Sequence, residues 1–166
     1  MAVRITAFPP VAPPDARVLV LGSMPSVESL NQGFYYAHPR NAFWRILAQV
    51  YGESFPEDIP ARIALLERHD LALWDVLASC ERQGSLDSAI REPVPNDFEE
   101  LFRRCPNIRR ILLNGGTAHR LFMKWGKPFI EGRDLRRLPS TSPAYTLSYE
   151  RKLAQWRQAL MNYESM

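Results

Sequence analysis

Cysteine, histidine and long hydrophobic runs are all scarce in this chain of 166 residues. The two cysteines, Cys80 and Cys105, lack metal-ligand spacing, so they predict neither a disulfide framework nor a zinc site. No apolar run approaches the roughly 20 residues that span a bilayer, and the N-terminus has no cleavage-site pattern. We therefore expect a cytoplasmic protein of a reducing compartment that uses neither a membrane nor a metal.

Several motifs of nucleotide-binding proteins and hydrolases are missing as well. The segment Gly22-Ser23-Met24-Pro25-Ser26 lacks the spacing of a dinucleotide fingerprint or a phosphate loop, and Gly-Lys-Ser occurs nowhere. A nucleotide cofactor is therefore not indicated. No serine lies in a Gly-x-Ser-x-Gly elbow, which argues against a serine hydrolase.

Charge is present but unevenly distributed along the chain. Residues 103–166 carry 13 Lys and Arg against 4 Asp and Glu, whereas residues 1–102 carry 8 against 14. A basic half of this kind is typical of a protein that binds a polyanion, although many basic surfaces serve only solubility. With 46% apolar residues, the length predicts a single domain over 1–166.

Hydrophobic periodicity predicts alternating strands and helices. Short aliphatic runs predict strands, the first of which should be central, and apolar residues at helical spacing predict the helices between them. This alternation predicts an α/β protein, a three-layer α/β/α sandwich with a four-stranded, mainly parallel sheet. We expect strands at 17–22, 71–76, 108–113 and 135–138, helices at 41–51, 58–68, 97–104, 117–125 and from 148, an extended N-terminal arm at 1–16, and irregular backbone at 79–96.

The predicted strand ends are rich in polar residues. In such a fold the carboxyl ends of parallel strands meet at one edge, where ligands bind. These ends carry Asp75 and the segments 23–26, 114–116 and 140–142. We therefore expect a crevice lined with hydroxyl and amide groups at this edge.

The stretch at 33–44 is the most unusual part of the chain. It places five aromatic residues, a histidine, an arginine and an asparagine after the first strand and at the start of a helix. Loops of this length and chemistry tend to be functional, and we interpret this one as the wall of a pocket for a flat ring. Residue by residue, the ordinary alternatives stay open: Tyr36 as core packing, His38 as a loop histidine, and Asn41 as a helix N-cap. His69 and His119 are expected to be structural or on the surface.

Three segments together resemble the uracil-DNA glycosylase superfamily, closest to its hypoxanthine (deoxyinosine) DNA glycosylase branch, sometimes called family six. They are Gly-Ser-Met-Pro-Ser at 22–26, Tyr-Tyr-Ala-His-Pro-Arg-Asn-Ala-Phe-Trp at 35–44, and Leu-Pro-Ser-Thr-Ser-Pro-Ala at 138–144. The resemblance implies hydrolysis of the N-glycosidic bond of a flipped, deaminated base, without a cofactor, in base-excision repair of DNA. It also implies the three-layer fold and is compatible with a monomer.

The resemblance assigns roles to particular residues. Met24 stands where the mismatch-specific branch has its catalytic Asn, so the catalytic role moves to Asn41, whose amide would position water. Tyr36 falls at the position of a stacking phenylalanine. The absence of the histidine that family one has in the last motif favours a purine over uracil. The base-binding residues are then Ser23, Met24, Pro25, Tyr36, Phe43 and Asn114, and the DNA-binding residues Ser26, Arg40, Ser140, Ser142, Pro143, Ala144 and Tyr145.

Two other functions remain open at this stage. A uracil or mismatch-specific uracil DNA glycosylase would share the fold and most of the motifs. The missing Asn or Asp of the first motif also allows a non-catalytic module that binds DNA lesions on the same fold.

Overall fold

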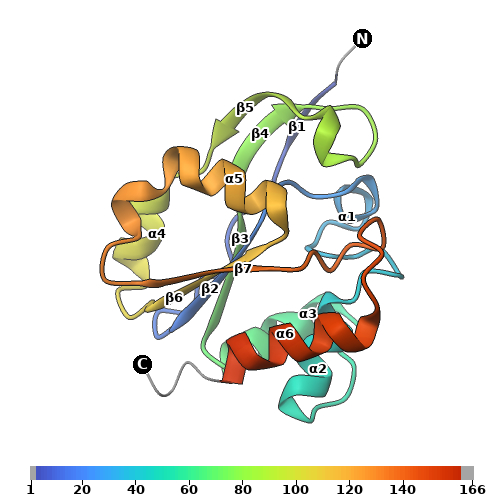
Figure 1. Ribbon diagram of the computed structural model, residues 1–166, viewed down its shortest axis with the longest axis vertical. Coiled ribbons are helices and arrows are strands. Elements are labelled where there is room, and N and C mark those ends of the chain that lie inside the picture. Colours follow the sequence, from blue (N-terminus) through green and yellow to red (C-terminus); the bar gives the residue numbers. More distant parts are fainter. Residues whose placement is uncertain (1–2, 162–166) are drawn as a thin grey trace.

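A parallel sheet of four strands forms the centre of the computed structural model, which describes residues 3–161 (Figure 1). The spatial order is β3 (Leu71–Asp75), β2 (Val18–Gly22), β6 (Arg110–Asn114) and β7 (Asp134–Leu138). Every neighbouring pair is parallel. All five residues of β2 are buried, because the strand is interior and both faces of the sheet are covered.

Helices cover both faces of this sheet (Figure 1). On one face lie α4 (Phe98–Arg104) and α5 (Gly116–Trp125); on the other lie α2 (Phe43–Tyr51), α3 (Ile59–Arg68) and α6 (Tyr149–Met161). Edge-to-face ring pairs pack the helices of each layer against one another. The ring centroids of Phe98 in α4 and Phe122 in α5 are 5.2 Å apart, and those of Phe43 in α2 and Trp156 in α6 are 5.9 Å apart. The predicted three-layer α/β/α fold with a four-stranded parallel sheet is thereby confirmed.

A second sheet was not predicted. Strands β1 (Arg4–Thr6), β4 (Leu77–Glu81) and β5 (Arg91–Pro95) form an antiparallel sheet with β4 in the middle. The expectation of irregular backbone over 79–96 is therefore wrong. The prolines of β5 suggested a loop, but an edge strand tolerates proline because one side of it needs no hydrogen-bond donor. Between β4 and β5 lies a short 3₁₀ helix, η1 (Asp87–Ala89).

The expected N-terminal arm is extended but takes part in the fold. Residues 4–6 are a strand, and Val11 forms an isolated antiparallel bridge with Leu73 of β3. The Tyr35 hydroxyl donates to the Pro9 carbonyl at 2.8 Å. This segment therefore supports the aromatic loop from behind.

Two short helical segments also lie outside the predicted pattern. Helix α1 (Val27–Gln32) is capped by Ser26, whose Oγ accepts a hydrogen bond from the Ser29 amide at 3.1 Å, and ends at Gly33 with φ 79°. Its six residues are too few and too polar to show a helical period. The 3₁₀ helix η2 (Lys127–Phe129) follows α5.

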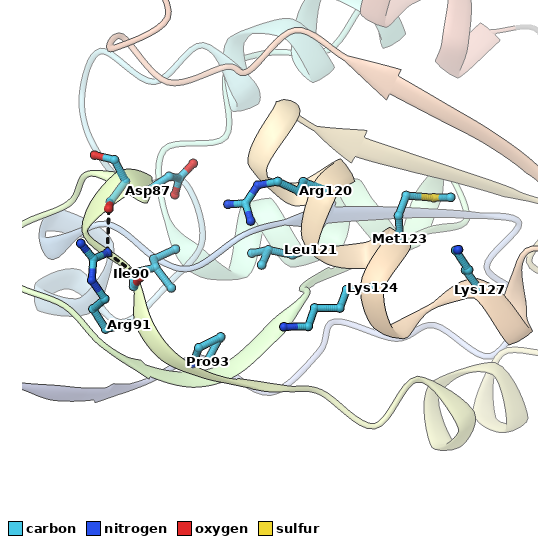
Figure 2. Close-up of a pocket in the computed structure, with 10 residues that line it drawn as sticks. Asp87, Ile90, Arg91, Pro93, Arg120, Leu121, Met123, Lys124 and Lys127 are labelled. Atoms are coloured by element: carbon cyan, nitrogen blue, oxygen red, sulfur yellow. Dashed lines mark hydrogen bonds between the residues drawn. The ribbon is translucent and has the colours of Figure 1, made fainter.

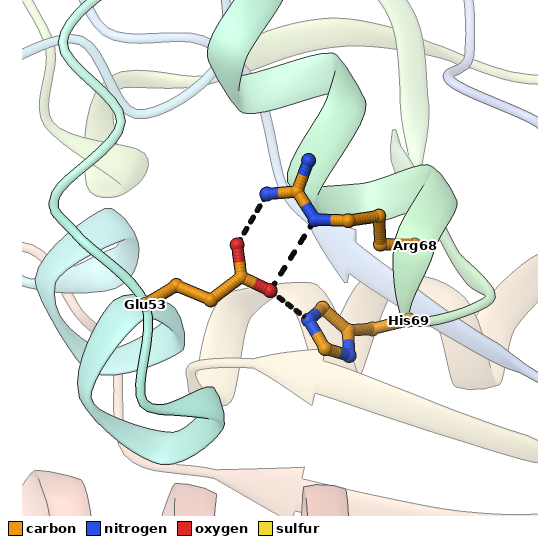
Figure 3. A network of polar contacts seen from close by, with 3 residues as sticks. All are labelled: Glu53, Arg68 and His69. Atoms are coloured by element: carbon orange, nitrogen blue, oxygen red, sulfur yellow. Dashed lines mark hydrogen bonds and ion pairs between the residues drawn. The ribbon is translucent and has the colours of Figure 1, made fainter.

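An ion-pair cluster joins the ends of α2 and α3 (Figure 3). The Glu53 carboxylate accepts hydrogen bonds from Arg68 and His69, and these two partners, Arg68 first, lower the pKa of Glu53. The His69 ring also stacks on the Tyr51 ring, with the two ring centroids 3.8 Å apart. His69 therefore makes structural contacts.

One apolar core joins the parallel sheet to both helix layers and to part of the second sheet. Its largest fully buried side chains include Trp44, Trp156, Phe43 and Phe122. None of the helices in residues 3–161 is at once long and apolar enough to cross a membrane.

Candidate active site

The carboxyl ends of all four parallel strands meet at one cavity of about 850 Å³. This volume is in the range of small-molecule sites and can hold a nucleoside. Of the residues predicted to bind or react, all but Phe43 and Arg40 line it: Ser23, Met24, Pro25, Ser26, Tyr36, Asn41, Asn114, Ser140, Ser142, Pro143, Ala144 and Tyr145.

Hydrogen bonds hold the loop at 33–44 against the rest of the protein. The buried Ser29 hydroxyl accepts from the Ala37 amide at 3.0 Å, and the Trp44 indole donates to the Tyr35 carbonyl at 2.9 Å. The Ala42 amide donates to the Thr141 carbonyl at 3.0 Å. The loop is therefore a fixed wall of the cavity, because its backbone is tied to α1 on one side and to the segment after β7 on the other.

Asn41 lies in this wall just before α2. Its Oδ1 accepts a hydrogen bond from the Phe43 amide at 3.0 Å, while Ala42 occupies the N-cap position. This bond fixes which end of the amide is oxygen and which is nitrogen. Because a carbonyl oxygen has two lone pairs, Asn41 retains one acceptor position and both Nδ2 hydrogens for a ligand or water.

Tyr36 sits between the cavity and the core. Its ring packs on the fully buried Phe43, with the centroids 4.3 Å apart, and its backbone has φ 52°, an uncommon conformation for a residue other than glycine. Phe43 does not line the cavity and instead supports Tyr36 from behind. The buried Tyr36 hydroxyl has no hydrogen-bond partner among the described residues. Burial, and then the negative charge of Asp75, raise the pKa of Tyr36.

Asp75, at the end of β3, lines the cavity as expected for that strand end, although no role in binding or catalysis was predicted for it. Its side chain is 3% exposed, and its Oδ2 has no hydrogen-bond partner within residues 3–161. Burial, and then the charge of Asp87, raise the pKa of Asp75 to about 7, against the opposing effect of Arg82. A carboxyl group that is partly protonated near neutral pH can donate or accept a hydrogen bond in the cavity.

Asn114 fixes the segment that follows β7. Its Oδ1 accepts from the Thr141 amide and its Nδ2 donates to the Thr141 hydroxyl, both at 3.0 Å. These two bonds use one Nδ2 hydrogen and one lone pair of Oδ1. Asn114 therefore ties two strand ends together as well as lining the cavity.

The segment from Ser140 to Tyr145 forms the rim of the cavity and is exposed in its second half. Pro143, Ala144 and Tyr145 are exposed, Tyr145 at 48%. The backbone below them is held by the buried Lys152, whose ammonium donates to the Ser142 carbonyl at 3.0 Å. Arg40, predicted to contact DNA, is exposed but lies outside the cavity lining.

The serines of the first motif have partners of their own. Ser26 caps α1, and the Ser23 hydroxyl donates to Asp87 Oδ1 at 2.7 Å. Met24 and Pro25 are buried and contribute apolar surface to the cavity.

Several residues that line the cavity were not predicted from the sequence, because only the fold brings them to the site. Asp87 comes from the segment expected to be irregular, and Arg120 and His119 come from α5. The glycines at 115 and 116 mark the start of that helix, but no signal in the sequence indicates which of its side chains reach the cavity. His119 had been expected to be structural or on the surface.

His38 also lines the cavity, and its Nδ1 accepts a hydrogen bond from the Arg40 amide at 3.0 Å. In the neutral ring the proton is therefore on Nε2, which makes this atom a donor.

Within residues 3–161 no three His, Cys, Asp or Glu side chains are grouped so that they could hold a metal ion.

Comparison with known proteins identifies the family. A sequence model described as the Uracil DNA glycosylase superfamily matches residues 9–164. Hypoxanthine DNA glycosylases of Methanosarcina barkeri and Methanosarcina acetivorans are each 32% identical, covering 92% and 90% of this chain and 95% and 93% of their own. The solution NMR structure of a candidate uracil DNA glycosylase from M. acetivorans superposes with a TM-score of 0.83 at 30% identity, covering 98% of this chain and 99% of its own. The chain belongs to the uracil DNA glycosylase superfamily.

Proposed function

We propose that this protein is a monofunctional DNA glycosylase that removes a deaminated base, chiefly hypoxanthine, from DNA by hydrolysis of its N-glycosidic bond. The observation that carries the proposal is the position of Asn41 and Tyr36 on one fixed wall of a cavity of nucleoside size. The names of the M. barkeri and M. acetivorans relatives support the choice of base.

Asn41 positions the attacking water. An amide is not a base near neutral pH, so its contribution is orientation: the free lone pair of Oδ1 accepts a hydrogen bond from water and directs the water toward C1′ of the sugar. The hydrogen bond from the Phe43 amide holds Oδ1 in place and reduces the reorganisation needed at the moment of reaction. The water oxygen forms the new bond to C1′ as the bond to the base breaks, and the sugar acquires oxocarbenium character. The proton that the attacking water loses passes to solvent water, because the Asn41 amide cannot accept it.

The leaving base takes the electron pair of the broken bond and must be neutralised. Asp75 in its protonated form and the Nε2 hydrogen of His38 are donors on the same cavity. Donation to a ring nitrogen or to O6 stabilises the purine as it departs. Tyr36 supplies a ring against which the flipped base stacks.

The nucleophilic side chains that line the cavity bear on the monofunctional assignment. A glycosylase that also cleaves the DNA strand forms a Schiff base through an amine. Among the described residues that line the cavity there is no lysine. This lining supports water as the nucleophile in the proposed reaction.

The exposed rim faces the DNA in this proposal. The side chains at 143–145 enter the space left by the flipped nucleotide, and the hydroxyls of Ser140 and Ser142 lie at the level of the phosphates. The protein in this proposal acts as a monomer on chromosomal DNA in the cytoplasm.

A panel of labelled duplexes, each with one deoxyinosine, deoxyuridine, deoxyxanthosine or ethenocytosine, tests this function. Cleavage of abasic sites after incubation should reveal product mainly from deoxyinosine. Product mainly from deoxyuridine would instead assign the chain to the uracil-specific alternative. Lesion binding without product from any duplex would favour the non-catalytic module.

A further inference from the structure

A second hollow of about 660 Å³ lies beside the active-site cavity (Figure 2). We call it the basic groove; its walls are the segment from η1 to β5, with Ile90, Arg91 and Pro93, and the outer side of α5, with Arg120 and Lys124. In Figure 2, Arg120 and Lys124 extend from α5 toward the opposite wall. The groove and the active-site cavity share Asp87, Ser88 and Arg120, so the two hollows adjoin at these residues.

The basic groove holds an excess of positive charge. Arg91, Arg120, Lys124 and Lys127 line it together with one acidic residue, Asp87. All four cations are exposed, and within residues 3–161 none of them forms an ion pair. Among the described residues the Arg91 guanidinium donates only to the backbone carbonyls of Ser88 and Ile90, both at 2.9 Å, and to no carboxylate.

This arrangement is unfavourable for the isolated protein. Arg120 and Lys124 are four residues apart on α5, a spacing at which like charges repel and slightly destabilise a helix. Asp87, the acidic residue among the described residues that line the groove, accepts its hydrogen bond from Ser23 on the side of the active-site cavity. Solubility requires exposed charges but not their concentration around one hollow, whereas a bound polyanion would offset the repulsion.

We propose that the basic groove binds the phosphodiester backbone of the lesion-bearing DNA strand next to the flipped nucleotide. The proposal rests on the proposed function, because the strand reaches the groove by leaving the active-site cavity past Arg120. Arg91, Arg120, Lys124 and Lys127 contact successive phosphates, and the apolar surface of Ile90, Pro93 and Leu121 lies against the sugars.

The test compares two double variants that each remove two positive charges. Lys124→Ala/Lys127→Ala removes charge from the groove. Arg104→Ala/Arg109→Ala removes it from exposed positions outside both hollows, in or near the turns that precede β6 at the opposite edge of the sheet. Lys124→Arg/Lys127→Arg keeps the groove charge. Fluorescence anisotropy with a lesion-free single-stranded oligonucleotide, over a series of salt concentrations, gives the affinity and its salt dependence.

We expect the groove variant to reduce the slope of log K against log salt by about 1.4, because each lost phosphate contact on a single strand removes about 0.7. The electrostatic part of binding then falls roughly 25-fold at about 0.1 M salt. The Arg104/Arg109 variant and the arginine variant should keep the wild-type slope. An equal loss of slope in the groove and Arg104/Arg109 variants, or no loss in either, would overturn the proposal.

Failure of the groove and failure of the proposed function give different results. If the groove variant excises hypoxanthine with wild-type kcat/KM and keeps the wild-type salt slope, the groove proposal is rejected and the proposed enzymatic function is kept. If the salt slope falls in the groove variant alone and the wild type excises no base, the groove is kept as a DNA-binding site and the proposed enzymatic function is rejected.

Discussion

The Asp75 carboxylate and the Tyr36 hydroxyl converge on the same face of Gly22. A Cβ atom at residue 22 would lie 2.6 Å from Asp75 Oδ1 and 2.7 Å from the Tyr36 hydroxyl oxygen. Both side chains also carry a buried oxygen without a partner in the described part of the chain. Two orphaned polar groups at the base of one cavity form a site that a polar ligand can satisfy.

Gly22→Ala tests this close approach. The new methyl group must displace the Asp75 carboxylate and the Tyr36 ring, and such overpacking costs about 1–3 kcal/mol of folding stability. We expect a lower midpoint in urea unfolding together with reduced glycosylase activity. Gly52→Ala is the matched control, because Gly52 has nothing within 4 Å of its added Cβ and also lies outside the cavity. Its φ of 66° will cost some stability, but full activity of Gly22→Ala alongside it would show that the approach is unimportant.

Asp75→Asn should change how stability depends on pH. The pKa of Asp75 is about 7 in the folded protein and 3.8 when exposed, so the folded state holds this proton more tightly. Its contribution is present in full below pH 3.8 and is lost as the pH rises through about 7. At pH 8 the variant should be more stable than the wild type, by about 4 kcal/mol at most, since each pKa unit corresponds to about 1.4 kcal/mol.

Urea unfolding at pH 5 and pH 8 measures this difference. The gain from Asp75→Asn should be larger at pH 8 than at pH 5, and equal gains would contradict the assigned pKa. The pH profile of excision gives a second readout: wild-type activity should fall above about pH 7 as the donor is lost, and the asparagine variant should lack this fall.

The sequence predicts a strand correctly where the strand is buried on both faces of the sheet, because its residues are then almost all apolar. Strands β2, β3 and β6 are such runs, and the helix at α2 shows its period through Phe43, Leu47 and Val50. The same period already placed Phe43 on the core side of α2, although the family resemblance had assigned it to the base. Its position behind Tyr36 agrees with the period.

The remaining parts depend on contacts that no local pattern reveals. β5 is an edge strand with two prolines, and its pairing with β4 is determined by the partner rather than by its own sequence. Asp87 and Arg120 reach the cavity only after β5 and α5 have packed. The buried state of Asp75, and hence its raised pKa, likewise arises from the fold, which brings Tyr36 of the loop at 33–44 close to Asp75 at Gly22.

Tyr36→Leu tests the stacking role. Leucine keeps apolar bulk against Phe43 but removes the ring face, and stacking of a base on an aromatic ring contributes about 1–3 kcal/mol. We expect kcat/KM for a deoxyinosine duplex to fall about 10- to 100-fold. Tyr36→Phe, which keeps the ring and removes only the unpartnered hydroxyl, should lose much less. If the two variants behave alike, the ring face is not the important feature.

Glu53→Gln examines the cluster that joins α2 and α3 away from the cavity. The lowered pKa of Glu53 means that this carboxylate stabilises the fold above its unfolded pKa of 4.5, and that the contribution is lost as the pH falls. The variant should lower Tm by a few degrees at neutral pH, with no difference from the wild type in strong acid. Excision should be unchanged, and a large loss of activity would show that the cluster reaches the site.

The most direct measurement of the central claim is single-turnover release of free hypoxanthine from a deoxyinosine duplex by the wild type and Asn41→Ala. Chromatography of the released base measures the chemical step, and circular dichroism confirms that the variant is folded. Loss of the positioned water predicts release by the wild type and a loss of at least about 100-fold in the variant, with DNA binding retained. Release at the wild-type rate by folded Asn41→Ala would contradict the account.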